Sequence, residues 1–126
     1  MGKFVIKKTK TGFVFNVVAG NGETIATSQV YKAKTSCKKG IRSVKATSAA
    51  AEIEDHTLED VKEFSNPKFE VYTDKSGETR FHLRARNGQI VAVSQAYKEK
   101  ASAVKGIESI KKNAPDAPVV EAEPEK

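Results

Sequence analysis

The chain has 126 residues and a mass of 13.7 kDa, the size of one small domain or of two half-domains that share a core. Its hydrophobic content of 38% and charged content of 30% are ordinary for a globular protein, and no apolar run is long enough to cross a membrane. A single cysteine, Cys37, excludes an internal disulfide and indicates a reducing compartment. The N-terminal residues lack the apolar core of a secretory signal, so we expect a cytoplasmic protein.

The net charge of +6 is unevenly distributed along the chain. Residues 3–45 and 68–112 carry +9 and +5, whereas residues 46–67 and 113–126 carry −5 and −3. Two basic units therefore alternate with two acidic segments. A solvated surface with internal charge balance explains this pattern, and a surface that attracts polyanions is the alternative.

The two basic units are copies of one another. Aligning residues 15–45 with residues 81–111 gives sixteen identities in thirty-one positions, with the shared skeleton F-x-x-x-A-x-N-G-x-x-x-A-x-S-Q-x-Y-K-x-K-x-S-x-x-K-G-I-x-S-x-K. Phe4 and Phe69 also match, but they lie 65 positions apart, whereas residues 15–45 and 81–111 align at a spacing of 66. The second unit therefore has one inserted residue after Gly77, in a turn that tolerates it. Chance does not produce such a match, and the chain is a tandem repeat.

Each unit begins with three predicted strands, recognised by short apolar runs and by alternation of apolar and polar residues. We predict these strands over residues 4–6, 15–19 and 25–27 of the first unit and over residues 69–72, 81–85 and 91–93 of the second. Asn21-Gly22 and Asn87-Gly88 stand between the second and third strands. Because both residue types tolerate positive φ, we predict tight type I′ hairpins there.

The pattern becomes helical from about residues 34 and 100. The apolar stripes of the two predicted helices consist of Cys37, Ile41 and Val44 and of Ala103, Ile107 and Ile110. Gly40 and Gly106 lie beside these stripes, where a glycine costs about 1 kcal/mol of helix stability. Their repetition predicts a packing reason, such as a close approach of the helix to the sheet.

A short apolar segment follows each helix, at residues 51–53 and 118–120, and predicts a fourth strand. Between the units, residues 55–67 form an acidic connector, for which we expect one helical turn at residues 57–64. We expect the last residues, 121–126, to be frayed.

The motif N-G-x-x-[IV]-A-x-S-x-x-Y, followed by K-x-S-x-x-x-G-I-x-S-[VI]-K, occurs in both units and resembles the YegP-like family of small, mainly bacterial proteins of uncharacterised function. The resemblance covers residues 3–54 and 68–120. It implies a β3-α-β unit that occurs singly, as a dimer or in tandem. It also implies that two units join into one continuous sheet, with the last strand of each exchanged onto the other. The family has no established catalytic or ligand residues, so the resemblance implies none.

We therefore expect an α+β fold, with two tandem β3-α-β repeats in one continuous antiparallel-rich sheet, one helix per repeat, and exchanged C-terminal strands. The first repeat is expected over residues 1–54, the connector over 55–67, the second repeat over 68–120 and the tail over 121–126. The two repeats are expected to form one cooperative domain and a monomer with internal pseudo-two-fold symmetry.

No motif for catalysis, a metal or a cofactor stands out. His56 and His82 have no H-x-x-x-H, C-x-x-C or D-x-D partner, and we expect both to be solvated. Cys37 lies on an apolar stripe, where a thiol is usually buried and inert. Acids outside the connectors are scattered singly, and no acid, cysteine or histidine is shared between the two copies. Since a duplicated unit should keep a catalytic group in both copies, we predict no enzymatic activity and no cofactor.

Binding is the function class that remains, because basic residues gather on one strand face and one helix side. The candidates for contacts with nucleic-acid phosphates are Arg80, Arg84 and Arg86 on the strand and Lys38, Arg42 and Lys45 on the helix. Aromatic residues that would stack on bases are absent from the strand face, so we expect weak binding, through phosphates. The alternatives are a solvated cationic surface, or a module for protein interaction or self-assembly that uses the open sheet face or an edge.

The duplicated tyrosines lie at the junction between the third strand and the helix. Tyr31 follows Gln29, and Tyr97 follows Gln95, at the same place in each unit. These residues form either a paired surface feature or a lid packed over the core, and we favour the lid.

Overall fold

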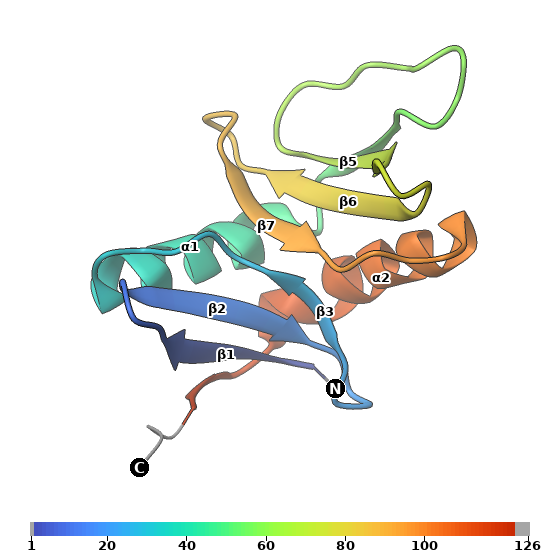
Figure 1. Cartoon of the computed structure of the whole chain (residues 1–126). Coiled ribbons are helices and arrows are strands. Elements are labelled where there is room, and N and C mark those ends of the chain that lie inside the picture. Colours follow the sequence, from blue (N-terminus) through green and yellow to red (C-terminus); the bar gives the residue numbers. More distant parts are fainter. Residues whose placement is uncertain (1, 123–126) are drawn as a thin grey trace.

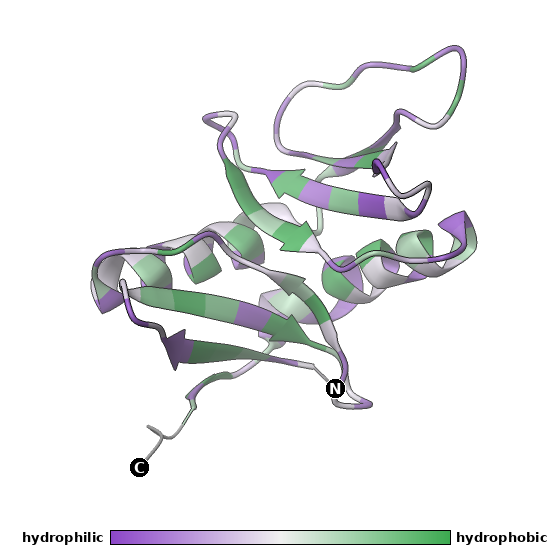
Figure 2. Cartoon of the chain, viewed as in Figure 1, coloured by the Kyte–Doolittle hydropathy of each residue, from purple (hydrophilic) through white to green (hydrophobic). Residues whose placement is uncertain are grey.

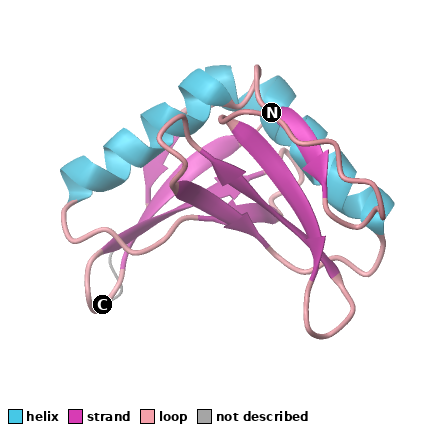
Figure 3. Cartoon of the chain, turned by 90° about the horizontal axis from the view of Figure 1, so that it is seen from above, coloured by secondary structure: helices cyan, strands magenta, loops and turns pink. Residues whose placement is uncertain are grey.

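Eight strands form one mixed sheet in the order β4-β5-β6-β7-β3-β2-β1-β8, as seen in a computed structural model that describes residues 2–122 (Figure 1). The strands are β1 (Lys3–Lys8), β2 (Phe13–Val18), β3 (Thr24–Thr27), β4 (Glu52–Asp55), β5 (Lys68–Thr73), β6 (Thr79–Arg84), β7 (Ile90–Ser94) and β8 (Val119–Glu121). The helices are α1 (Lys34–Thr47) and α2 (Lys100–Asn113), and a short 3-10 helix, Ala114–Asp116, follows α2. Both long helices lie on one face of the sheet (Figure 3). Among the described residues, no helix is both long and apolar enough to cross a membrane.

The last strand of each repeat joins the sheet beside the first strand of the other repeat. β4 pairs in parallel with β5, and β8 pairs in parallel with β1. The two repeats meet at the centre, where β3 and β7 pair antiparallel through Ala26 with Ser94 and Thr27 with Val93. The other neighbouring strands are antiparallel. This architecture confirms the predicted α+β fold of two β3-α-β repeats with exchanged last strands.

The turn between the second and third strands of each repeat differs from the predicted type I′ hairpin. Among residues 2–122 only glycines have a positive φ, so Asn21 does not adopt the conformation that a type I′ turn requires. The Gly22 N–H donates to the Ala19 carbonyl over 3.0 Å, and the Ala19 N–H donates to the Glu23 carbonyl over 2.8 Å. This is a three-residue loop, in which a type I turn is followed by a left-handed glycine. The second repeat has the same loop, with Gly88 at a φ of 85°.

The connector and the tail also differ in part from expectation. Residues 57–60 form a turn and a bend, and residues 61–64 have no regular structure, so the expected helical turn does not form there. The predicted tail overlaps β8, since Glu121 still belongs to that strand and pairs with Ile6 of β1. The remaining tail residues, 123–126, lie outside the described part of the chain.

One core fills the space between the sheet and the two helices. Its largest members are four buried phenylalanines, which form edge-to-face pairs within each repeat: Phe4 with Phe15 and Phe69 with Phe81, each with ring centroids 5.9 Å apart. The predicted helix stripes face this core, and all six of their residues are buried. Burial raises the pKa of the Cys37 thiol, as expected for an inert, structural cysteine.

The duplicated tyrosines form a lid over the core rather than a surface feature. Tyr31 stacks on Phe15, and Tyr97 stacks on Phe81, with interplanar angles of 15° and 10°. Both tyrosines are partly buried and pack against the core, and this burial raises the pKa of their hydroxyls. Each hydroxyl also reaches the helix glycine of its own repeat. The repeated glycine therefore makes room for the tyrosine that crosses it.

Gly106→Ala is expected to destabilise the protein, although alanine favours a helix by about 1 kcal/mol. A Cβ atom at Gly106 would lie 2.9 Å from the Tyr97 hydroxyl and 3.2 Å from the Phe81 ring. Overpacking of this kind typically costs about 1–3 kcal/mol, so we expect a net loss of about 1 kcal/mol in thermal or denaturant unfolding. The same substitution in a Tyr97→Phe background should cost less, because that change removes the closest atom. A rise in melting temperature in the single variant would contradict this account.

Candidate functional site

Charged side chains gather on the sheet face that the helices leave open, over β4, β5 and β6. In a strand every second residue points to the same face, and Figure 2 shows this alternation of apolar and polar residues along β6. Glu54 of β4 lies in register with Glu70 of β5, which lies in register with His82 of β6. We call this group the open-face cluster; its members are Glu54, His56, Lys68, Glu70, His82 and Arg84.

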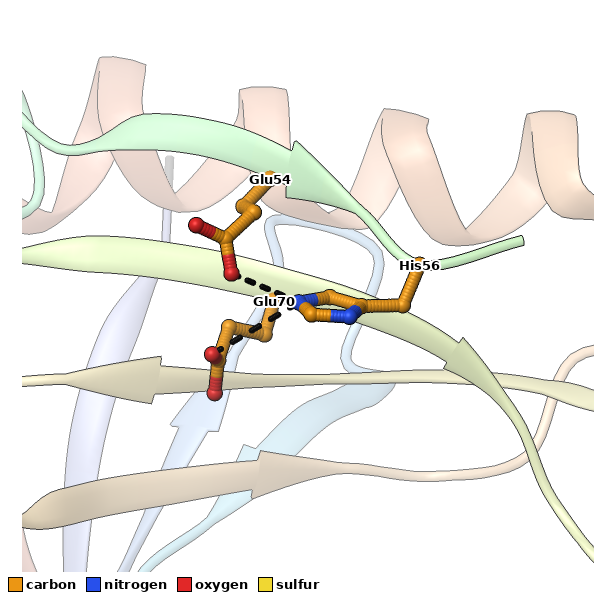
Figure 4. Close-up of side chains that lie close together, drawn as sticks. All are labelled: Glu54, His56 and Glu70. Carbon is orange, nitrogen blue, oxygen red and sulfur yellow. Dashed lines mark hydrogen bonds and ion pairs between the residues drawn. The ribbon is translucent and has the colours of Figure 1, made fainter. Parts of the chain in front are cut away.

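His56 lies between the two carboxylates of the open-face cluster (Figure 4). Its Nε2 atom is 2.6 Å from Glu54 Oε2 and 3.7 Å from Glu70 Oε2. The other oxygen of Glu54 accepts hydrogen bonds from the Phe64 N–H over 2.8 Å and from Lys68 Nζ over 2.9 Å. The other oxygen of Glu70 is held by His82 and Arg84. Every carboxylate oxygen in the cluster thus faces a donor.

These contacts keep both carboxylates ionised at neutral pH. Burial alone would raise the pKa of Glu54, whose side chain is 2% exposed. Hydrogen bonds from Lys68, Phe64 and His56 outweigh burial and lower this pKa to about 2. Burial would also raise the pKa of Glu70. Hydrogen bonds from His82 and Arg84 outweigh this effect, so the pKa of Glu70 is lowered as well.

Acid is expected to destabilise the fold through Glu54. Its pKa is lower in the folded chain than in the unfolded one, so its contribution is fully present above about pH 4.5 and is lost as the pH falls toward 2. After allowance for screening by water near Lys68, we expect a contribution of about 2 kcal/mol. Glu54→Gln should flatten the fall in stability between these pH values in urea unfolding. Glu59→Gln, which changes an exposed acid of the connector, should leave the fall unchanged; equal slopes for wild type and Glu54→Gln would refute the assignment.

The open-face cluster corrects two sequence predictions. His82 is not solvated, since its side chain is only 15% exposed and bonds Glu70, and the half-exposed His56 is held by Glu54. The acids are not scattered singly, because Glu54 and Glu70 lie side by side. Their proximity depends on the parallel pairing of β4 with β5, which no local spacing in the sequence reveals.

The predicted arginines of the strand face are largely neutralised by neighbouring acids. Arg80 pairs with Asp74 over 2.9 Å, and Arg84 pairs with Glu70 of the open-face cluster. Arg86 lies beyond the end of β6, in the exposed turn before β7. The structure therefore does not bring these three residues together as a free cationic surface.

The predicted basic residues of the helix do come together. Lys38, Arg42 and Lys45 line a groove of about 300 Å³ between α1 and β8, which we call the cationic groove. Its other lining residues are Ile6, Ile41, Val119 and Glu121. Within residues 2–122, no carboxylate forms an ion pair with any of the three cations. The Lys45 ammonium lies 5.8 Å from the centre of the Phe4 ring, a cation–π distance that leaves its charge uncompensated.

The second repeat lacks two of the three cations that line the cationic groove. In the alignment of the repeats, Val104, Glu108 and Lys111 stand where the first repeat has its three cations. Lys111 is further engaged with the carbonyl of Ala51 over 2.7 Å. The cluster of three cations therefore belongs to the first repeat only. The fold that the two repeats share does not require it.

A symmetric pair of ionic contacts ties each exchanged strand to the helix of the other repeat. Lys34, at the start of α1, pairs with Glu121 of β8, and Lys100, at the start of α2, pairs with Asp55 of β4. The two repeats thus share an acid after all, at positions beyond the stretch that aligns by identity. The duplicated lysine has a structural role here.

The duplicated Ser-Gln pairs lie near the pseudo-two-fold axis, where β3 meets β7. The hydroxyls of Ser28 and Ser94 accept hydrogen bonds from the backbone N–H groups of Phe15 and Phe81, over 2.9 Å each. The exposed residues Gln29 and Gln95 border a shallow depression on the open face, together with Thr24, Thr27, Ser28, Arg80, Ile90, Val93 and Ser94. The serines therefore satisfy the backbone, and the exposed glutamines hydrogen-bond the tyrosine of their own repeat, Gln29 to Tyr31 and Gln95 to Tyr97.

Known proteins are similar to this chain along most of its length. UPF0339 protein PA0329 of Pseudomonas aeruginosa is 40% identical over 116 residues, which cover 91% of this chain and 92% of that protein. A UPF0339 protein of Methanosarcina acetivorans is 60% identical over 53 residues, which cover 42% of this chain but 91% of that protein. That relative is thus little longer than one repeat.

Solved structures and a family model agree with these relatives. The solution structure of yegP from E. coli, a protein of unknown function, superposes with a TM-score of 0.79 at 34% identity, covering 99% of this chain and 96% of that one. The solution structure of UPF0339 protein SO3888 from Shewanella oneidensis gives a TM-score of 0.78 at 28% identity, covering 95% and 90%. The model of a domain of unknown function, DUF1508, matches residues 9–55 and 74–121. With both repeats matched, this chain belongs to the DUF1508 family of YegP-like proteins.

Proposed function

We propose that this protein is a non-enzymatic binding module whose cationic groove takes the phosphate backbone of a nucleic acid. The observation that carries the proposal is the convergence of Lys38, Arg42 and Lys45 on one groove without carboxylate partners among residues 2–122. Glu121 also lines the groove and interacts with Lys38 at longer range, but it pairs with Lys34, so an excess of positive charge remains. Such an excess attracts polyanions, which release their counterions on binding. The strand arginines contribute less, because Asp74 and Glu70 neutralise two of them.

The shape of the groove supports contacts with a backbone rather than with bases. Its floor is formed by the aliphatic side chains of Ile6, Ile41 and Val119, and no aromatic ring lines it. Base stacking would require such a ring, so we expect little sequence preference. Three phosphate contacts would give weak binding that depends steeply on salt.

The absence of enzymatic activity is part of the proposal. Cys37 is buried with a raised pKa, and the duplicated Ser28 and Ser94 hydroxyls are bonded to the backbone. These groups serve the fold, and none has the exposed, activated form that a nucleophile needs.

Binding of an extended acidic peptide is the second candidate function. β8 forms one edge of the sheet, beside the cationic groove, and its outer backbone groups have no strand partner in the described sheet. Val119 and Val120 on this strand are exposed. A peptide could add to this edge as a further strand while its acids contact the groove.

Binding of short single- and double-stranded DNA and RNA across a salt series tests the proposal. If three phosphates are contacted on a duplex, raising salt from about 50 to about 200 mM should weaken binding about 40-fold. The triple variant Lys38→Gln, Arg42→Gln, Lys45→Gln should bind more weakly and lose most of this salt dependence. No measurable binding at low salt would refute the proposal and favour the peptide.

A matched control separates the groove from net charge. Lys98, Lys105 and Lys112 are exposed lysines of the second repeat, and changing all three to glutamine removes the same charge. This control variant should retain most of the affinity of the wild type. Equal losses in both triple variants would mean that charge acts diffusely and that the groove is not a site.

A further inference from the structure

We propose that the open-face cluster is a binding site for a divalent transition-metal ion, with Glu54, His56 and Glu70 as its three protein ligands. One ligand atom from each of these residues lies within 4.8 Å of the other two. They come from β4, from the residue just after it, and from β5 (Figure 4). One imidazole and two carboxylates are ligands that suit Zn²⁺ and its neighbours rather than Mg²⁺ or Ca²⁺.

The two oxygens of each carboxylate have different surroundings, and this difference supports the assignment. One oxygen of Glu54 is held by Lys68 and the Phe64 N–H, and its other oxygen faces His56. Glu70 also has one oxygen held by the next strand, and its other oxygen lies 3.7 Å from His56 and 3.6 Å from Lys68. Metal-binding carboxylates are typically oriented in this way, by hydrogen bonds to the oxygen that does not bind the metal.

His82 and Arg84 are then positioning residues rather than ligands. Both contact the same oxygen of Glu70, on the side away from His56. The His82 ring also packs against Tyr72, with centroids 5.2 Å apart, which fixes its orientation. Because His82 and Arg84 hold one oxygen of Glu70 from β6, the other oxygen is left on the side of His56.

The two distances from His56 to the carboxylates bracket the spacing of a tetrahedral site. With metal–ligand bonds of about 2.0–2.1 Å, ligand atoms in such a site lie about 3.3 Å apart. His56 Nε2 is 2.6 Å from Glu54 and 3.7 Å from Glu70, so the histidine has to move away from one carboxylate and toward the other. His56 is 41% exposed and follows the end of β4, so it has the freedom to move. The same exposure leaves a fourth position for water.

Lys68 opposes the metal. Its ammonium lies 2.9 Å from Glu54 and 3.6 Å from Glu70, and together with Arg84 it already balances the two negative charges. A divalent ion therefore enters a site of nearly zero net charge, which limits its affinity.

Titration of the untagged chain of 126 residues with Zn²⁺ and Co²⁺, in the absence of nucleic acid, tests this site. Calorimetry should show one Zn²⁺ per chain, and Co²⁺ should give the visible absorption of a tetrahedral complex. His56→Gln should bind Zn²⁺ at least about 10-fold more weakly. Loss of a residue that only hydrogen-bonds a ligand already costs about 10-fold in metal affinity, and loss of a ligand should cost no less. Glu59→Gln, which changes an acid of the same connector outside the cluster, should bind like the wild type.

Two outcomes would overturn the proposal: no binding by the wild type, or equal binding by His56→Gln. Circular dichroism of each variant shows whether it is folded, and the half-exposed His56 is the ligand whose replacement disturbs the core least. Since no nucleic acid is present, the result does not depend on whether the cationic groove binds phosphates.

Discussion

Residues 1–66 and 67–126, produced as separate chains, are expected either to remain unfolded or to dimerise. In the intact protein β8 pairs with β1, and β4 pairs with β5. The last strand of each half therefore pairs with the first strand of the other half. Cutting the connector exposes the free edge of a first strand and part of the common core. Size-exclusion chromatography with light scattering, and circular dichroism of each half, would measure the outcome.

The second half is expected to dimerise better, because the first repeat departs from the family pattern in its shorter turn before Phe15 and at Cys37. Two copies can restore the eight-stranded sheet, each supplying the last strand of the other. The relative from Methanosarcina acetivorans, little longer than one repeat, shows that one unit exists as a chain of its own. A stable monomeric half with dispersed amide signals would mean that the repeats are independent, and strand exchange would then contribute little to stability.

Phe81→Ala is expected to cost about 3–5 kcal/mol, the usual range for a large buried aromatic residue. Phe81 is 1% exposed and contacts both the Phe69 ring and the Tyr97 lid. Because the repeats share one core, the loss should appear in a single transition that includes the first repeat. Denaturant unfolding and hydrogen exchange of the amides in β1 and β2 would measure it.

Phe64→Ala is the control for this substitution. Phe64 belongs to the connector and is only partly buried, so its removal should cost much less. Normal protection of β1 and β2 amides in Phe81→Ala, at a denaturant concentration that exposes β6, would contradict a shared core. Two separate calorimetric transitions of the wild type would do the same.

The sequence predicts the elements of this fold well because the information is local and appears twice. Alternation gives the strands, the period of about 3.6 gives the buried stripe of Cys37, Ile41 and Val44, and each copy corroborates the other. The exchange of last strands came from the family resemblance. The predicted hairpin type was wrong because Asn-Gly occurs in more than one kind of loop. Gly20, before Asn21, also belongs to the loop, which therefore has three residues rather than the two of a type I′ hairpin.

The candidate sites differ in how far the sequence alone could predict them, because some depend on local spacing and others on contacts between distant segments. Lys38, Arg42 and Lys45 share one side of α1 by helical spacing alone, so the groove they line could be anticipated. The strand arginines could not be judged without knowing that Asp74 and Glu70 face them. The open-face cluster depends on the register between β4 and β5, and a parallel register between distant segments has no local signature.

Chemical-shift mapping with a short single-stranded oligonucleotide tests the central functional claim most directly. At low salt, the account predicts that amide shifts concentrate in α1 around Lys38, Arg42 and Lys45 and in the adjacent strand β8. The shifts should disappear as salt rises, and α2 of the second repeat should be unaffected. Shifts that centre on the open face of β6, or no shifts at saturating oligonucleotide, would contradict the assignment of the cationic groove as a nucleic-acid site.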